Sequence, residues 1–165
     1  MNKLLLFDVD GTIAESSKKI NPEIKTCLDL LHKKRLTIGI VGGGKIDKIL
    51  SQIGDNNFIE HYFSECGSVY HKLDLVSKKY DLIYCNNIQT HKYFHLINNI
   101  ITCAKYFLSM VDYNIIGKSI DVRNGLIYIS LIGMDASDEE RETYIKSDKK
   151  YNYRSRLLGY LDNEL

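Results

Sequence analysis

The chain has 165 residues, of which 44% are hydrophobic and 26% charged, a composition that suits one folded domain with a buried core. Its formal net charge is only +1, so no bulk electrostatic argument favours a nucleic acid or a membrane surface as partner. No apolar run is long enough to span a bilayer, and the four cysteines lack metal-ligand spacing. We therefore expect a soluble cytoplasmic protein with reduced thiols, no signal peptide, and no nucleic-acid or membrane partner.

The first predicted element is a strand that ends in two acidic residues. The apolar run Leu4–Phe7 has the length of a strand buried on both faces, and Asp8 follows it directly. Asp8 and Asp10 are one residue apart, so in an extended chain both carboxylates point to one side while Val9 points into the protein. Gly11 then permits a tight turn. This pattern favours a divalent cation bound by the two carboxylates, and its alternative is an acidic turn that caps the next helix.

A helix and a second strand follow. Asn21 with a proline after it predicts an N-cap for a helix that runs up to the basic cluster at residues 33–35, and residues 36–41 form the next apolar run. The two strands are expected to be parallel, with a right-handed crossover between them. This topology places the glycines 42–44 at the same sheet edge as Asp8.

The glycine loop allows two readings. Gly39–Lys45 nearly matches a nucleotide-binding phosphate loop, but Ile46 stands where the magnesium-binding Ser or Thr is needed, which disfavours that reading. A tight turn into a helix over residues 46–53, ended by Gly54, requires no ligand at all.

The second half of the chain predicts a small α+β layer. Apolar residues recur at helical spacing over 88–108. Two further apolar runs, 120–122 and 126–131, flank the Asn-Gly pair at 124–125, which is a strong hairpin signal. Ser137, with a glutamate three residues on, predicts a capping box that opens the last helix.

Several motifs resemble known proteins. The segment Asp8–Thr12 (Asp-Val-Asp-Gly-Thr), placed after an apolar strand, resembles the first motif of the haloacid dehalogenase superfamily of phosphotransferases. Further segments resemble, in the same order, those of the eukaryotic-type phosphomannomutases in that superfamily: Phe63–Val69, Asn87–His91, Asp121–Ser130, Ile132–Gly133 and Ser137–Arg141.

The resemblance implies roles for residues in the first half. Asp8 would be the nucleophile that becomes an aspartyl phosphate, and Asp10 the general acid and base. Both would take part in a Mg²⁺ site. Gly43 and Gly44 would lie in the loop that binds the transferred phosphoryl group, although the family has a serine at the position of Gly44.

The resemblance also implies a substrate clamp in the second half. Arg123 and Arg141 match two arginines that hold the distal phosphate, because a guanidinium can donate to two phosphate oxygens at once. A third arginine of the family is replaced here by Met134.

Taken together, these motifs predict an α/β protein with a partial haloacid-dehalogenase-like (Rossmann-like) parallel core over residues 1–85 and a partial α+β cap over residues 86–165. The implied reaction interconverts mannose 6-phosphate and mannose 1-phosphate, with Mg²⁺ and a hexose 1,6-bisphosphate primer. The resemblance further implies a hexose phosphate as ligand, a cytoplasmic place in GDP-mannose biosynthesis, and a homodimer formed through the cap.

The resemblance covers roughly the N-terminal two-thirds of the family's proteins. The family's motif-three lysine and motif-four acids have no counterpart in this sequence, and such charged groups contribute strongly to phosphoryl transfer. Three interpretations therefore stay open: a mutase, a reduced sugar-phosphate phosphatase, and an inactive remnant or interaction module.

Overall fold

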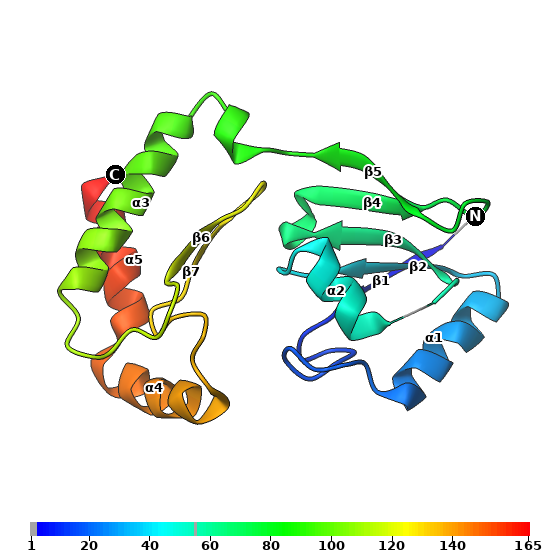
Figure 1. The fold of residues 1–165 in the computed structure, drawn as a ribbon, viewed down its shortest axis with the longest axis horizontal. Helices are drawn as coiled ribbons and strands as arrows, with labels where there is room; N and C mark the ends of the chain where they lie inside the picture. The colour runs from blue at the N-terminus through cyan, green and yellow to red at the C-terminus, as the bar shows by residue number, and fades with distance from the viewer. Residues whose placement is uncertain (1–2, 55) are drawn as a thin grey trace. The chain divides into compact units, whose positions relative to one another are not determined.

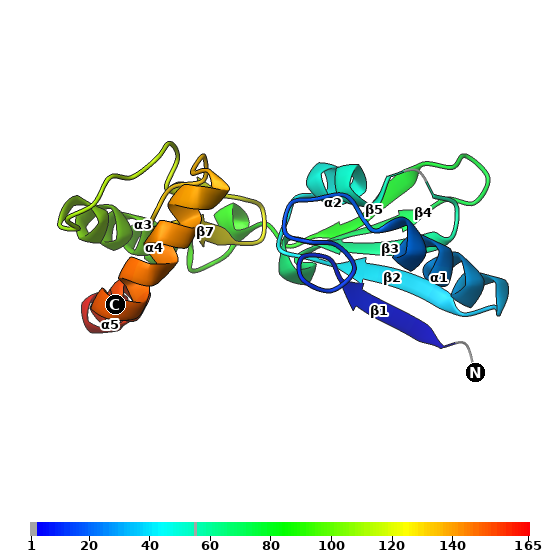
Figure 2. The same ribbon diagram turned by 90° about the horizontal axis from the view of Figure 1, so that it is seen from below.

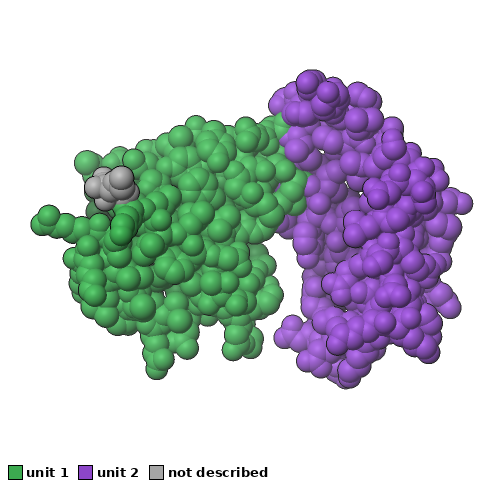
Figure 3. All heavy atoms as spheres, turned by 180° about the vertical axis from the view of Figure 1, so that it is seen from behind, with its two compact units in different colours: residues 1–87, 124–126 green, residues 88–123, 127–165 purple. Residues whose placement is uncertain are grey.

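The computed structural model describes residues 3–54 and 56–165 (Figure 1). The chain divides into two compact units, which Figure 3 shows in different colours. Unit 1 comprises residues 1–87 and 124–126, and unit 2 comprises residues 88–123 and 127–165. Each unit has its own hydrophobic core, and the two are described separately.

Unit 1 is built on one five-stranded sheet whose strand order follows the sequence. Its strands are β1 (Leu4–Asp8), β2 (Thr37–Val41), β3 (Ile59–Ser64), β4 (Val69–Leu73) and β5 (Tyr80–Cys85). The first three are parallel, as predicted for β1 and β2, whereas β4 and β5 pair antiparallel. The α/β class with a partial parallel core is confirmed, and β4 and β5 extend that core as antiparallel strands.

Two helices connect the parallel strands, as predicted. Helix α1 (Pro22–Lys33) begins after Asn21, whose side chain accepts a hydrogen bond from the Glu23 N–H, and α2 (Ile46–Ile53) ends at Gly54. Both right-handed crossovers step the same way along the sheet, so both helices lie on one of its faces (Figures 1 and 2). The core of unit 1 lies under them and includes the fully buried side chains of Ile38, Ile40, Ile49, Ile53, Ile59 and Tyr62.

Strand β1 is not buried on both faces, contrary to the prediction. It is an edge strand of the described sheet and pairs only with β2, from Leu4 opposite Thr37 to Asp8 opposite Val41. Leu4 is 49% exposed and Leu6 50% exposed. The apolar run therefore marks a strand with one covered and one open face.

Unit 2 consists of a short 3-10 helix, three α-helices and a two-stranded hairpin. Its elements are α3 (Phe94–Ser109), β6 (Ile120–Val122), β7 (Ile127–Ile129), α4 (Asp138–Tyr151) and α5 (Tyr153–Glu164). The predicted capping box at Ser137 is confirmed, because Ser137 and Glu140 bond each other's main chains. The hairpin is also confirmed, but Val122 pairs with Ile127, so four residues rather than two form its turn.

Two boundaries in unit 2 differ from the prediction. Residues 88–90 form a short 3-10 helix, and α3 begins only at Phe94. The C-terminal helical stretch is divided at Asn152, whose left-handed backbone ends α4 and precedes α5. Aromatic side chains fill the core between these helices, including Phe107, Tyr144 and Tyr153.

The structure also describes the cysteines and the length of the apolar helices. The four cysteines are free thiols in the described structure, without a disulfide between them. Within residues 3–54 and 56–165, none of the helices combines the length and the apolar character of a membrane span.

Candidate active site

Asp8 and Asp10 lie on either side of the point where β1 ends. Asp8 is the last residue of β1 and is exposed, while Val9 is only 2% exposed and packs into the core, as predicted. Three consecutive N–H groups, those of residues 12–14, then converge on the Val9 carbonyl oxygen at 3.0–3.2 Å. Gly11 adopts φ +81°, a conformation that residues with a Cβ resist, and its N–H donates to the Ala14 carbonyl. The loop after β1 is therefore tightly wound and holds Asp10 close to the strand end.

The Asp10 carboxylate has three partners from outside the motif. Its Oδ1 accepts hydrogen bonds from the Ser17 N–H at 3.0 Å and from the Gln52 Nε2 at 2.8 Å. Its Oδ2 lies 3.8 Å from the Lys48 Nζ. Partial burial by itself raises the pKa of this carboxyl, but the Ser17 N–H, the Gln52 amide and the Lys48 charge together hold the pKa below its ordinary value.

Lys48 and Gln52 are site residues that sequence reasoning missed. Both belong to α2, and their four-residue spacing places them on one face of that helix. The available signal was this spacing in a helix that starts directly after the glycine loop. It was not sufficient, because the motif at Asp10 lies 42 residues before Gln52 in the sequence.

Main-chain hydrogen bonds connect the glycine loop after β2 to β3 and to the turn that follows β3. The Gly42 N–H donates to the Phe63 carbonyl, the Glu65 N–H to the Gly44 carbonyl, and the Cys66 N–H to the Gly42 carbonyl, each at 3.0 Å. Because Asp8 pairs with Val41, the loop begins beside the strand end that carries Asp8. The structure thus places Gly43 and Gly44 at the predicted edge of the sheet, although Gly44 offers no hydroxyl there.

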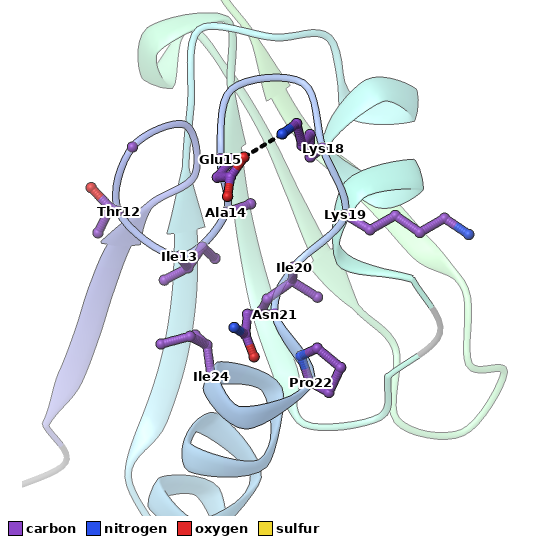
Figure 4. A pocket seen from close by; sticks show the side chains of 11 residues that line it. Thr12, Ile13, Ala14, Glu15, Lys18, Lys19, Ile20, Asn21, Pro22 and Ile24 are labelled. Carbon is purple, nitrogen blue, oxygen red and sulfur yellow. Dashed lines mark hydrogen bonds and ion pairs between the residues drawn. The ribbon is translucent and has the colours of Figure 1, made fainter.

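A cavity of about 450 Å³ lies beside this site rather than at its carboxylates (Figure 4). Its walls come from residues 11–15 and 18–22 and from Ile24, and the side chains of Glu15 and Lys18 form an ion pair at its rim. Neither Asp8 nor Asp10 lines it. The cavity therefore carries no argument about a reaction at Asp8.

The donor set at the strand end fits a magnesium ion that keeps water ligands. Mg²⁺ in phosphoryl-transfer sites is usually held by one or two carboxylates together with water and substrate phosphate. Asp8 is exposed at the sheet edge, two residues before the second carboxylate, Asp10. The described part of the chain has no cluster of three or more His, Cys, Asp or Glu side chains with metal-site geometry, so a dedicated protein cage is not formed.

The two arginines predicted to bind substrate both lie in unit 2. The Arg123 Nε donates to the Asp121 Oδ2 at 2.7 Å, and its guanidinium carbon lies 5.1 Å from the centre of the Tyr128 ring. Arg141 donates from Nε to the Ala136 carbonyl and from Nη2 to the carbonyl of Met134, at 2.9 and 2.6 Å.

Both arginines therefore have partners within unit 2, and Arg141 stabilises the loop before α4. Their predicted contact with a distal phosphate stays a prediction.

Comparison with known proteins gives a consistent picture. The family model described as eukaryotic phosphomannomutase matches residues 24–165. The chain is 35% identical to phosphomannomutase 1 of Homo sapiens over 98% of its own length, and 32% identical to a phosphomannomutase of Glycine max over 96%.

The same matches cover only 61% and 62% of those two proteins, so the chain spans about six-tenths of the length of these curated relatives. A solved structure of Plasmodium falciparum IMP-nucleotidase, N-terminally truncated and bound to IMP, covers 99% of this chain with a TM-score of 0.60 at 14% identity. The match spans 48% of that nucleotidase and concerns the fold alone.

Proposed function

The chain belongs to the eukaryotic phosphomannomutase family, and we propose that it is a phosphotransferase that acts on hexose phosphates through Asp8. The observation that carries this proposal is the position of Asp8. It is an exposed carboxylate at the end of β1, beside the start of the glycine loop and two residues from a carboxylate with a fixed orientation.

The proposed chemistry begins with an attack by an Asp8 oxygen on the phosphorus of a sugar phosphate. A bond forms between that oxygen and phosphorus, and the bond between phosphorus and the sugar oxygen breaks. Asp10 gives a proton to the departing sugar oxygen and later accepts a proton from the hydroxyl that attacks phospho-Asp8. Magnesium, held by Asp8 and Asp10, would offset the negative charge of the carboxylate and the phosphoryl group.

The finer proposal is the interconversion of mannose 6-phosphate and mannose 1-phosphate. A hexose 1,6-bisphosphate would phosphorylate Asp8, and phospho-Asp8 would then transfer its phosphoryl group to the free hydroxyl of a mannose phosphate. Return of the other phosphoryl group to Asp8 releases the isomer. Arg123 and Arg141 would bind the phosphate that is not reacting. Two copies of the chain would form a homodimer through the cap.

The experiment measures Mg²⁺-dependent turnover of mannose 1-phosphate, with and without a hexose bisphosphate primer, for the wild-type chain and for Asp8→Asn. The proposal predicts mannose 6-phosphate from the wild type alone. Free phosphate without isomerisation would instead identify a phosphatase. Absence of both products would favour the inactive remnant or interaction module, and activity retained in Asp8→Asn would exclude Asp8 as nucleophile.

A further inference from the structure

Gln52 connects Asp10 to the loop that follows the motif. Its side chain lies on α2 and is 4% exposed. The Nε2 donates one hydrogen bond to the Asp10 Oδ1 at 2.8 Å and another to the Lys18 carbonyl at 3.2 Å. Its main-chain carbonyl accepts from the Ile20 N–H at 2.8 Å. One buried residue thus contacts the carboxylate and two points on the segment beyond it.

This arrangement gives the two oxygens of Asp10 different environments. Oδ1 accepts from both the Gln52 amide and the Ser17 N–H. Among residues 3–54 and 56–165, the polar group nearest to Oδ2 that forms an ion pair with it is the half-exposed Lys48 ammonium, at 3.8 Å, which is beyond hydrogen-bond distance. Turning the carboxylate away from Gln52 and Ser17 would break both bonds to Oδ1 and leave one N–H of the buried Gln52 amide without its acceptor, which is unfavourable. The orientation of Asp10 is therefore fixed, with Oδ2 as the oxygen available for a proton.

We propose that Gln52 is a positioning residue for the phosphoryl-transfer reaction, because it holds Oδ1 of Asp10 so that Oδ2 faces the reacting sugar oxygen. This inference rests on the proposed function of Asp10 as general acid and base. Gln52 itself is 4% exposed, so in this proposal it acts through Asp10 and not by contact with the substrate. Its removal should consequently slow the chemical step and leave substrate binding nearly unchanged.

The test compares Gln52→Met, which keeps the length of the side chain but loses the amide, with Ser51→Ala as the matched control. Ser51 is the preceding residue on α2 and is exposed, and its Oγ donates to the Lys48 carbonyl. With mannose 1-phosphate and a hexose bisphosphate primer, we expect Gln52→Met to lower kcat by about 10- to 100-fold with KM within about twofold. Ser51→Ala should keep both constants.

A double-mutant cycle distinguishes two roles of Gln52: positioning Asp10 for catalysis, and only stabilising the loop. If Gln52 acts through Asp10, adding Gln52→Met to Asp10→Asn causes no further loss of kcat, because the two residues work as one unit. If Gln52 only stabilises the loop, the two losses multiply. Multiplying losses, or an unchanged kcat in Gln52→Met, would overturn the proposal.

A crystal structure of Gln52→Met decides the positioning even if the wild-type chain proves inactive. We expect the Asp10 carboxylate to turn or to occupy two orientations. An Asp10 carboxylate in its original single orientation would overturn the inference. An inactive wild type combined with a turned Asp10 would instead refute the proposed function while leaving the positioning contact intact.

Discussion

Gly44→Ser is the most informative substitution in the glycine loop, because it adds a hydroxyl at the position where the resemblance to the family implies a serine. The backbone of Gly44 does not have a positive φ, so a side chain there causes no backbone strain. A Cβ at residue 44 would lie 3.3 Å from the Lys48 Cδ and 3.7 Å from the Ile49 Cγ1. The closer neighbour belongs to a flexible, half-exposed lysine, which can shift by the few tenths of an ångström required.

The expected gain follows from one added hydrogen bond. A hydroxyl that donates to a charged phosphoryl oxygen contributes about 1.5–3 kcal/mol. If that bond is made in the transition state, kcat/KM rises by about 10- to 150-fold. Gly44→Ala is the matched control, since it adds the same Cβ without the hydroxyl.

The assay is Mg²⁺-dependent conversion of mannose 1-phosphate by wild type, Gly44→Ala and Gly44→Ser, with thermal unfolding measured for all three. We expect Gly44→Ser to exceed Gly44→Ala by the stated factor at similar melting temperatures. Equal activities for the two folded variants would refute the placement of the phosphoryl group at this loop.

Three further predictions concern unit 2. Gly133→Ala should destabilise unit 2, because φ at this residue is +97° and the added Cβ would lie 1.8 Å from the Ile116 carbonyl oxygen. The expected loss in the free energy of unfolding exceeds the about 1–3 kcal/mol of a strained backbone alone. Denaturant unfolding measures this loss, and a value below about 1 kcal/mol would contradict the prediction. Asp148→Ala should cost about 1–3 kcal/mol, because the 7% exposed carboxylate accepts from the N–H and Nε of Arg154; an unchanged melting temperature would be inconsistent with that role. Burial, and after it the charge of Asp148, raises the pKa of Tyr144 to about 12. The protonated hydroxyl of Tyr144 therefore stabilises the folded state fully below pH 10, and this stabilisation is lost between about pH 10 and 12. Melting temperatures measured from pH 8 to 12 should fall less steeply in Tyr144→Phe than in the wild type, and equal slopes would argue against this contribution.

Local signals in the sequence were sufficient for three elements of unit 1: α1, β2 and α2. The cap at Asn21, the apolar run of β2 and the stop at Gly54 depend on neighbouring residues, so they predicted α1, β2 and α2 closely. Strand β5 lacked such a signal, because every one of its residues is exposed or half-buried and no alternating apolar pattern exists. The apolar run of β1 was misjudged for a different reason, since a sequence does not reveal whether a neighbouring element covers each face.

The sequence predicted the two carboxylates of the candidate site but not the residues that contact them. Asp8 and Asp10 were identifiable because carboxylates directly follow an apolar run. The partners of Asp10 could not be identified in the same way. Gln52 lies on α2, which follows β2, and it contacts Asp10 only once α2 packs against the loop after β1. The main-chain partners of Arg141 were equally hidden, since a guanidinium that donates to nearby carbonyls has no distinct sequence pattern.

The most direct test of the central claim is to look for phosphate on Asp8 itself. The chain is incubated with Mg²⁺ and hexose 1,6-bisphosphate labelled in its phosphates, quenched in acid, and the label is mapped by peptide mass analysis beside Asp8→Asn. Transfer through Asp8 predicts a hydroxylamine-sensitive acyl phosphate on the peptide that contains Asp8, absent from the variant. No label on the folded wild-type protein, or equal label on Asp8→Asn, would contradict the account.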